Sequence, residues 1–338
     1  MNPTLRQRYG INNDRPIVAL APMAGVTDLP FRTLCEAMGA DFSVTEMAAT
    51  APRLLASQKN QKRLHFTPHA RVNIVQIIGN QATEMAQAAR QYADLGADII
   101  DINLGCPAKK VNKKGAGSAL LADLKRVEEI LTAVTHASPV PITVKTRLGT
   151  DHDTDTVFEI ARLAVELEIE LLTIHGRTRA CRFSGTAQFE QIAAVKYHFP
   201  QLAIIANGDI DSLERCKTVL TQTRCDGVMI GRGAIGQPWL LSDIRRHFDD
   251  HFIAPHLDKP ALILRHIAEI HNFYGPTRGV RFARKHIRRY LEQLQFGSAF
   301  SRLAAVDCPK EQLNILADIL MALSENTASS SHHHKPVA

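Results

Sequence analysis

The residue with the most distinctive chemical setting in this sequence is Cys106, in the segment Asn103-Leu104-Gly105-Cys106-Pro107. Gly105 and Pro107 on either side of the cysteine favour a tight turn, directly after an apolar run that predicts a strand. Such a turn would hold the thiol at the end of the strand. A thiol there can act as nucleophile, metal ligand or proton donor, and the alternative is a buried structural cysteine.

The spacing of the six cysteines excludes some of these roles for Cys106. The six cysteines are Cys35, Cys106, Cys181, Cys216, Cys225 and Cys308. They form no Cys-x-x-Cys pair and show no regular spacing, which argues against a zinc site and a disulfide framework, so we predict free thiols. The roles that remain for Cys106 are those of a nucleophile and of an acid. A cysteine with an ordinary pKa of about 8.5 is mostly protonated at neutral pH and can donate a proton, provided that Lys109 and Lys110 do not lower that pKa too far.

Short runs rich in Ile and Val recur between segments of helical period, as expected for strands buried on both faces and covered by helices. The runs are Ile17 to Met23, Phe42 to Glu46, Asn73 to Ile78, Ile99 to Leu104, Ile142 to Lys145, Leu171 to His175, Ala203 to Ala206 and Gly227 to Ile230. Thr27 or Asp28 can cap a first helix that has Pro30 in its first turn, and Ser118 can precede another. The pattern predicts a right-handed, parallel (β/α)₈ TIM barrel.

Polar or reactive residues stand where these predicted strands end. They are Glu46, Gln76, Asn103 with Cys106, Lys145, His175, Asn207 with Asp209, and Arg232. A single polar residue at a strand end is ordinary, but barrel active sites are assembled at the carboxyl ends of the strands, and so many such residues would converge there.

Two of the loops at this end are suited to bind phosphate. The turns Asn207-Gly208-Asp209 and Gly231-Arg232-Gly233 follow the seventh and eighth predicted strands, and they offer backbone N–H groups and one guanidinium. FMN fits such a site. Lys145 can place a cation beside the N1 and C2 carbonyl of a flavin, although it can equally be a salt-bridged barrel lysine.

The composition is that of an ordinary folded protein. Of 338 residues, 45% are hydrophobic and 22% are charged, so a sizeable core is available. Met1 is followed by polar residues, and no apolar stretch is long enough to span a membrane, so we expect a cytoplasmic protein without membrane contact. The formal charge of +6 permits a polyanionic partner but could equally be a charge that keeps the protein soluble.

The strand pattern ends before about residue 259, and helical period continues to Ala322. We therefore predict a barrel domain over residues 1–250, a small all-helical bundle over 251–326 with a linker near 252–260, and a flexible tail over 327–338. The tail carries His332, His333 and His334, which we interpret as part of a flexible terminus; we expect no metal site.

Several ordered motifs together resemble the tRNA-dihydrouridine synthases, and the bacterial B-type subfamily most of all. The resemblance is carried by Ala21 to Asp28, Asn103 to Lys114, Ala116 to Ser118, Thr173 to Thr178, Asn207 to Asp209, Met229 to Arg232, Phe273 to Pro276 and Arg284 to His286. It therefore covers nearly the whole chain. The departures that we notice are Thr146 to Gly149 and the pair Arg288-Arg289, outside the core motifs.

The resemblance implies an FMN enzyme that takes hydride from NADPH and passes it to C6 of a uracil in the D-loop of tRNA, with position 17 as the expected target. Cys106 matches the cysteine that protonates C5. By the same comparison Pro22, Met23 and Ala24 match the backbone floor beneath the flavin, Gln76 and Lys145 its ring contacts, His175 a further residue facing the ring, and Asn207, Gly208, Asp209, Gly231 and Arg232 its phosphate cradle. Asn103 and Arg177 match positions near the uracil or its nucleotide.

A basic segment in the helical part would hold the RNA. Its cations are Arg278, Arg281, Arg284, Lys285, Arg288 and Arg289, with no acidic residue from Gly275 to Tyr290. Helical spacing places several on one face, opposite a stripe of Val280, Ala283, Ile287 and Leu291. A basic helix face is usually only solvated, but with the resemblance we expect Arg281, Arg284, Lys285 and Arg288 to contact tRNA.

Two other functions remain open. An FMN barrel similar to a dihydroorotate dehydrogenase would act on the C5–C6 bond of a free pyrimidine, without need of a basic helical domain. A catalytically silent RNA-binding protein would keep the barrel as a scaffold, and replacing Cys106 would leave it unaffected. We expect the protein to be a monomer.

Overall fold

The computed structural model describes residues 3–11, 13–51, 57–66, 70–151 and 155–330. The chain divides into two compact units. The first consists of Met1–Ala234 and Trp239–Ala254, and the second of Ile235–Pro238 and Pro255–Ala338.

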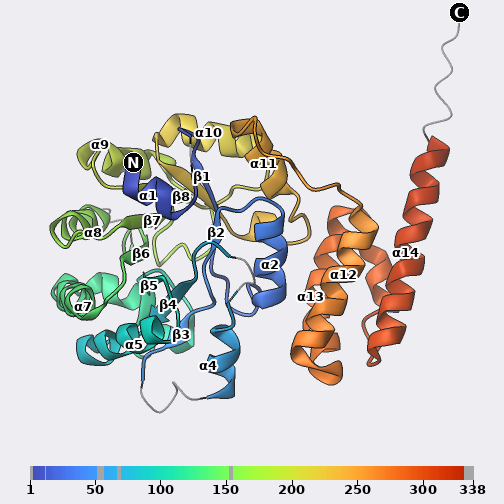
Figure 1. Cartoon of the computed structure of the whole chain (residues 1–338), viewed down its shortest axis with the longest axis horizontal. Helices are drawn as coiled ribbons and strands as arrows, with labels where there is room; N and C mark the ends of the chain where they lie inside the picture. The colour runs from blue at the N-terminus through green and yellow to red at the C-terminus, as the bar shows by residue number, and fades with distance from the viewer. Residues whose placement is uncertain (1–2, 12, 52–56, 67–69, 152–154, 331–338) are drawn as a thin grey trace, which may run out of the picture. The chain divides into compact units, whose positions relative to one another are not determined.

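The first unit is built on a parallel sheet with the strand order β2-β1-β9-β8-β7-β6-β5-β4-β3 (Figure 1). The strands are β1 (Ile17–Leu20), β2 (Phe42–Ser43), β3 (Ala48–Ala49), β4 (Ile74–Ile78), β5 (Ile99–Asn103), β6 (Ile142–Arg147), β7 (Leu171–His175), β8 (Ile204–Asn207) and β9 (Gly227–Ile230). Nearly all strand residues are buried, as the apolar runs predict for strands covered on both faces.

The sheet closes at the second predicted strand. β2 pairs with β1 through Ala19 and Phe42, and the next residue after β2, Val44, forms a parallel bridge to Ile74 of β4. The prediction of one strand over Phe42 to Glu46 is therefore wrong in its length. After Val44, the side chain of Thr45 accepts a hydrogen bond of 3.1 Å from the backbone N–H of Gln76. Strand pairing resumes only at β3, which was not predicted. The closed parallel arrangement confirms the predicted (β/α)₈ barrel.

Helices cover the outside of the barrel (Figure 1). They are α2 (Leu29–Ala37), α5 (Ala82–Asp94), α7 (Leu124–Ala137), α8 (Asp155–Glu166), α9 (Phe189–His198), α10 (Leu213–Thr223) and α11 (Leu240–Phe248). Asp28 caps α2 as predicted, since its carboxylate accepts from the N–H of Phe31 at 3.1 Å. The predicted helix start at Ser118 is wrong. A 3₁₀ turn, η1 (Gly117–Ala122), comes first, and the carboxylate of Asp123 caps α7.

The amino-terminal end of the barrel is filled by apolar side chains. Leu5 of α1 (Pro3–Arg8) and Tyr9 join a buried cluster with Ile17 and Phe42, the first residues of β1 and β2. The Tyr9 and Phe42 rings lie 4.6 Å apart. This packing leaves the opposite, carboxyl end of the strands for polar side chains.

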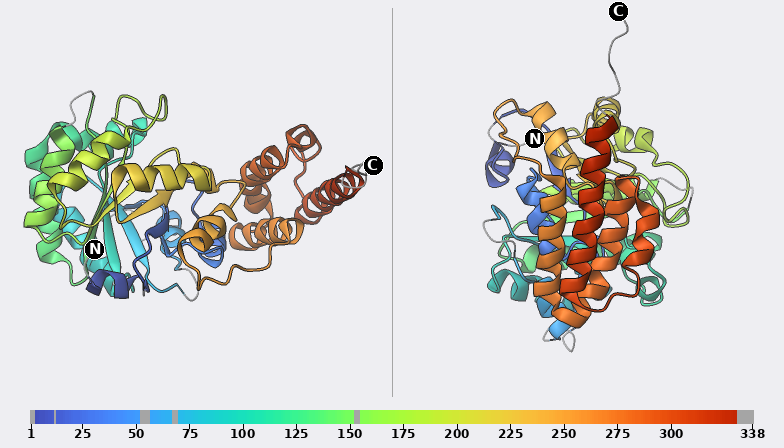
Figure 2. Two further views of the ribbon diagram at one scale, coloured as in Figure 1. Left: turned by 90° about the horizontal axis from the view of Figure 1, so that it is seen from above. Right: turned by 90° about the vertical axis from the view of Figure 1, so that its right-hand side faces the viewer.

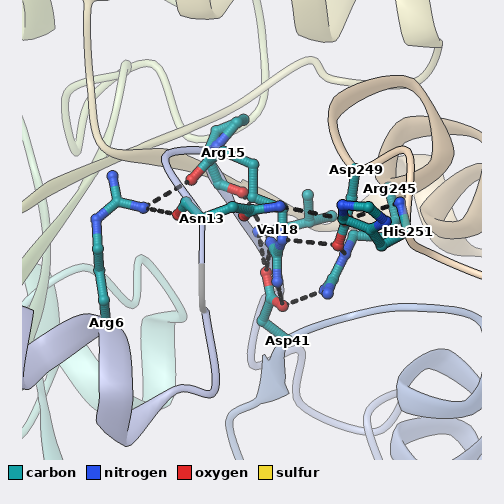
Figure 3. Close-up of polar contacts among 9 residues, drawn as sticks. Arg6, Asn13, Arg15, Val18, Asp41, Arg245, Asp249 and His251 are labelled. Atoms are coloured by element: carbon teal, nitrogen blue, oxygen red, sulfur yellow. Dashed lines mark hydrogen bonds and ion pairs between the residues drawn. The ribbon is translucent and has the colours of Figure 1, made fainter.

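A buried network of charges secures the same amino-terminal end (Figure 3). Arg15 pairs with Asp41 at 2.6 Å and with Asp249, just after α11, at 3.1 Å. Arg245 of α11 bridges the same two carboxylates. Asp41 also accepts from the N–H of Val18 in β1 at 2.8 Å. The network thus ties β1, the segment before β2 and the last barrel helix together.

The second unit is helical. Its elements are α12 (Lys259–Tyr274), α13 (Pro276–Gln293), η3 (Gly297–Arg302) and α14 (Pro309–Ser330), and the three α-helices lie side by side (Figure 2). The stripe of Val280, Ala283, Ile287 and Leu291 on α13 is fully buried, as predicted.

Helix α14 continues to Ser330, into the segment predicted as a tail. The rest of that segment, 331–338 with its three histidines, lies outside the described residues. Within the part of the chain that the structure describes, no group of His, Cys, Asp and Glu could hold a metal ion, and no helix could cross a membrane.

Candidate active site at the carboxyl end of the barrel

A connected layer of polar side chains crosses the barrel above its apolar end. Asp101 of β5 lies at its centre, and it accepts from Gln76 Nε2 of β4 and from Thr143 Oγ1 of β6, both at 2.7 Å. Gln76 in turn accepts from Asn103 Nδ2 at 2.7 Å. Burial raises the pKa of Asp101, and its two hydrogen bonds and the charge of Lys145 act in the opposite direction.

Asn103 joins this layer to the turn that carries Cys106. Its side-chain oxygen accepts from the backbone N–H groups of Gly105 at 3.1 Å and Cys106 at 2.9 Å. From the other side, the carbonyl of Cys106 accepts from the N–H and the hydroxyl of Ser118, at 3.1 and 2.9 Å. The turn is therefore fixed at both faces, and Asn103 is engaged as a support of the cysteine.

The turn keeps Cys106 half-buried. Burial raises the pKa of its thiol above the ordinary value. A hydrogen bond from the backbone of Ala108 and the charge of Arg147 lower this pKa, but by less than burial raises it. The thiol is thus protonated at neutral pH, which favours a proton donor over a nucleophile. All six cysteines are free, as predicted.

Lys145 lies on β6, in register with Asn103 of the neighbouring strand β5. Its ammonium donates to Asn207 Oδ1 of β8 at 2.8 Å, and Asn207 Nδ2 donates to the carbonyl of Met229 in β9 at 2.7 Å. Burial lowers the pKa of Lys145 to about 8, helped by the charge of Arg147 and opposed by that of Asp101. Its bond to the Asn207 amide leaves further N–H donors on this cation.

His175 and Arg177 lie together after β7. Arg177 Nη1 is 3.3 Å from His175 Nε2, so the histidine accepts on that nitrogen, because a guanidinium can only donate. Burial, followed by the charges of Lys145, Arg147, Arg177 and Arg232, holds the pKa of His175 well below its ordinary value. His175 is therefore neutral at physiological pH.

The buried guanidinium of Arg177 supports the loop after β8. It donates to both carboxylate oxygens of Asp209, at 2.8 and 2.6 Å, and to the carbonyls of Ser184 and Gly185. Asp209 also accepts from the N–H of Ala187 at 2.8 Å. The predicted contact of Arg177 with a uracil stays a prediction, and the carboxylate of Asp209 is held by Arg177 and by the N–H of Ala187.

The two glycine turns after β8 and β9 pack against each other. A Cβ at Gly233 would lie 2.1 Å from the carbonyl oxygen of Ile210, so only glycine allows this approach. Gly231 lies beside the first loop, since a Cβ there would be 3.7 Å from Ala21 Cβ and from Met23 Sδ. Arg232 is more than half exposed and lies 3.6 Å from Asp209. The structure thus gathers the predicted positions after β1, β8 and β9.

Three residues that support the site were not among the predicted ones. Asp101 stands in the run Ile99 to Asn103 with the same parity as Asn103, which was a usable signal, because alternate residues of a strand share a face. Ser118 was interpreted as a helix start and as part of a family motif, without a role at the cysteine. Arg147, noted only as a departure, is almost fully buried and donates to the carbonyls of Gly105, Thr178 and Arg182 at 2.8 to 3.0 Å. No local sequence pattern predicts such a contact between loops.

The predicted RNA contacts lie on α13 in the second unit. Arg281 is exposed and forms no ion pair with the described residues. Arg284 is paired with Asp307 at 3.0 Å, Lys285 lies 4.4 Å from the centre of the Phe282 ring, and Arg288 pairs with Glu292 at 2.8 Å. The last pair is largely exposed, so its charge remains available for exchange with a phosphate.

A closed parallel barrel with polar side chains joined across its carboxyl end defines the class of (β/α)₈-barrel enzymes. The fold is similar to that of histamine dehydrogenase from Rhizobium sp. 4-9, with a TM-score of 0.53 and 11% identity over 75% of this chain and 48% of that chain. This likeness concerns the fold alone.

The family is defined by the sequence. The family model described as Dihydrouridine synthase (Dus) matches residues 19–325, and the chain belongs to this family. It is 45% identical over 322 residues to tRNA-dihydrouridine synthase B of Pasteurella multocida (strain Pm70), covering 93% of this chain and 97% of that protein. It is also 45% identical over 313 residues to tRNA-dihydrouridine synthase B of Escherichia coli (strain K12), covering 91% and 97%. The resemblance stated from the motifs is confirmed.

Proposed function

We propose that this chain is a tRNA-dihydrouridine synthase that uses FMN and NADPH to reduce the C5–C6 bond of a D-loop uridine, at position 17. Membership of the dihydrouridine synthase family supports the reaction, and the names of its relatives support tRNA as the substrate. The resemblance to the B-type subfamily supports position 17. We expect the enzyme to act as a monomer in the cytoplasm, where it would meet tRNA.

The observation that carries the proposal is the setting of Cys106. Its thiol stands on a turn that Asn103 and Ser118 hold at the carboxyl end of the barrel, and its pKa is raised by burial. A protonated thiol fixed in this place is suited to protonate a substrate carbon. The neutral state of His175 supports the same assignment, because a histidine with a strongly lowered pKa has no proton to spare at neutral pH.

The residues at the barrel mouth fit a flavin mononucleotide. Lys145 offers a half-buried cation for the electron-rich edge of the ring, and Gln76 offers an amide that is already held by Asp101. The backbone of Asn207 to Asp209 and of Gly231 with the guanidinium of Arg232 would hold the phosphate. Because its carboxylate is bound to Arg177, Asp209 would serve the phosphate through its backbone.

When bound, FMN supplies to C6 of the uracil the hydride that NADPH brings. As the C6–H bond forms, the π electrons of the C5–C6 bond move to C5. Cys106 gives its proton to C5, and the remaining thiolate takes a proton from solvent to restore the acid. One hydride and one proton thus balance the reduction. Asn103 keeps the thiol on the turn while this occurs.

A uracil inside folded tRNA must leave its stack to reach the barrel mouth, at a cost of a few kcal/mol. Contacts between tRNA phosphates and Arg281, Arg284, Lys285 and Arg288 on α13 would offset this cost. The basic composition of α13 also favours tRNA over a free pyrimidine as the substrate, because a free pyrimidine would need no basic helix.

The test is to incubate the protein with FMN, NADPH and unmodified tRNA, and to map dihydrouridine by mass spectrometry. The proposal predicts one dihydrouridine, at position 17. Product at another uridine would revise the target alone. Bound FMN and NADPH oxidation without any dihydrouridine would overturn the assignment of tRNA as substrate.

A further inference from the structure

A pocket of about 480 Å³ opens beside the turn of Cys106. Its lining residues are Pro107, Lys109, Asn112, Lys113, Asp151, Arg179, Ala180 and Arg182. Pro107 directly follows the cysteine, and the two lysines belong to the short helix α6 (Lys109–Asn112) and the residue after it. Asp151 follows β6, and the two arginines follow β7. Three successive loops at the carboxyl end of the barrel thus form one concavity.

The pocket carries a concentrated positive charge that the described residues do not neutralise. Four cations and one carboxylate line it, which leaves a net charge of three. Among the described residues, neither these cations nor Asp151 take part in a salt bridge or a side-chain hydrogen bond, in contrast to the engaged Arg147 and Arg177 nearby. Like charges gathered in a concavity repel one another, and an anion relieves that repulsion.

The backbone holds the loops of this pocket in place. The N–H groups of Arg179 and Ala180 donate to the carbonyls of Gly149 and Thr150, both at 2.9 Å, and so tie the loop after β7 to the loop after β6. The N–H of Lys113 donates to the carbonyl of Lys109 at 2.9 Å. The cations are therefore presented by ordered main chain beside the reaction centre.

We propose that this pocket binds the phosphate groups of the reductant, with the 2′-phosphate of the adenosine half of NADPH as its main ligand. The inference rests on the proposed function, in which a nicotinamide dinucleotide is the electron source. A 2′-phosphate is a phosphomonoester that approaches two negative charges at neutral pH, and the diphosphate of the same molecule adds two more. Lys109, Lys113, Arg179 and Arg182 match such a dense anion, and Asp151 can accept from a ribose hydroxyl or an adenine amino group.

The volume of the pocket is suited to a small ligand. A volume of about 480 Å³ lies within the roughly 300 to 1,000 Å³ of small-molecule pockets. A tRNA strand carries one negative charge per phosphodiester and spreads its charges along the backbone, whereas the reductant concentrates its phosphate charges in one small molecule. The pocket therefore makes the enzyme selective for NADPH over NADH, since NADH lacks the 2′-phosphate.

The first test is direct binding to the FMN-loaded enzyme, measured by isothermal titration calorimetry. Adenosine 2′,5′-bisphosphate should bind at least about tenfold more tightly than 5′-AMP, because charged hydrogen bonds of this kind are each worth that much. The double variant Lys113→Ala/Arg179→Ala should lose this preference. Lys110→Ala is the matched control, because Lys110 is exposed on the same helix but does not line the pocket, and it should keep the preference. Equal binding of the two nucleotides to the unaltered enzyme would overturn the inference.

The second test separates the two half-reactions under anaerobic conditions. In stopped-flow experiments, the double variant should need at least about tenfold more NADPH for flavin reduction and respond little to NADH. When the flavin is instead reduced with dithionite, the variant should oxidise it with tRNA at the rate of the unaltered enzyme. A loss confined to the tRNA step would show an RNA-phosphate site and contradict the inference. If dithionite-reduced unaltered enzyme makes no dihydrouridine, the proposed function fails. The calorimetric experiment would still show whether the pocket binds a 2′-phosphate.

Discussion

The side-chain oxygen of Asn103 accepts a hydrogen bond of 2.9 Å from the backbone N–H of Cys106. The amide nitrogen of the same residue donates to Gln76 Oε1, which belongs to the polar layer around Asp101. Asn103 thus connects the turn that carries the proposed acid to the rigid interior of the barrel. The position of the thiol depends on this one side chain as well as on the turn itself.

Asn103→Ala removes both bonds and should slow dihydrouridine formation by about 10- to 100-fold, because a displaced acid no longer lies in line with its carbon. Flavin reduction by NADPH, which needs no acid, should change little. Single-turnover oxidation of the reduced enzyme by tRNA measures the first effect, and anaerobic reduction the second. Asn103→Asp keeps the acceptor for Cys106 but not the donor to Gln76. Its rate of dihydrouridine formation should therefore lie between those of the unaltered protein and Asn103→Ala. Equal slowing of both half-reactions in Asn103→Ala would instead indicate a general loss of structure.

Lys145 should make FMN binding depend on pH. Its pKa is lowered to about 8, so the ammonium is present below pH 8 and is lost as the pH rises above it. Binding of FMN to the flavin-free protein should therefore weaken across this range, as followed by the quenching of flavin fluorescence. Lys145→Met should bind FMN more weakly at neutral pH and lose this part of the pH dependence. A dependence that persists unchanged in Lys145→Met would assign it to another group.

The barrel was predictable because its strands are buried on both faces. Runs such as Leu171 to His175 and Gly227 to Ile230 have the same bounds in the sequence and in the structure, since the helices on one side and the barrel interior on the other both demand apolar residues. The second strand was mispredicted because its pairing is broken by a side chain, that of Thr45, whose hydrogen bond to Gln76 is not local in sequence. Ser118 has the residue type of a helix cap, but its hydroxyl is used on the carbonyl of Cys106.

The candidate site was predictable at the strand ends and less so beyond them. Topology alone brings the residues after successive parallel strands to one edge, so Asn103, Lys145 and His175 could be placed without knowing any contact. Long side chains that cross between loops follow no such rule. Arg147, which holds three carbonyls from two loops, was therefore assigned no role, and Arg177 was expected near the uracil although its guanidinium is bound to Asp209.

The buried charges at the other end of the barrel should matter for stability alone. Asp41→Asn leaves Arg15 and Arg245 without their shared carboxylate charge, and removing one partner of a buried pair costs about 3–5 kcal/mol of unfolding free energy. Urea denaturation followed by circular dichroism measures this loss. Arg162→Ala, which breaks only exposed pairs with Glu159 and Glu166, is the comparison and should leave stability nearly unchanged. Similar losses in the two variants would mean that the network is not buried in solution.

Arg281 should contribute to tRNA affinity through charge. It is exposed on α13 and forms no ion pair with the described residues, so it can neutralise a phosphate without breaking a bond. Arg281→Ala should weaken tRNA binding and lower the slope of log Kd against log salt by roughly 0.7 to 0.9. Filter binding at several salt concentrations gives both values, with Arg162→Ala as a control for lost charge elsewhere. An unchanged slope would exclude Arg281 from the RNA contacts.

The central claim is that Cys106 supplies the proton to the uracil. The most direct measurement compares the unaltered protein with Cys106→Ala, both loaded with FMN and reduced by NADPH, and quantifies dihydrouridine in tRNA by mass spectrometry. Because only the proton donor is removed, Cys106→Ala should bind FMN and oxidise NADPH normally yet form almost no dihydrouridine. Dihydrouridine formed by Cys106→Ala at the rate of the unaltered protein would contradict the account.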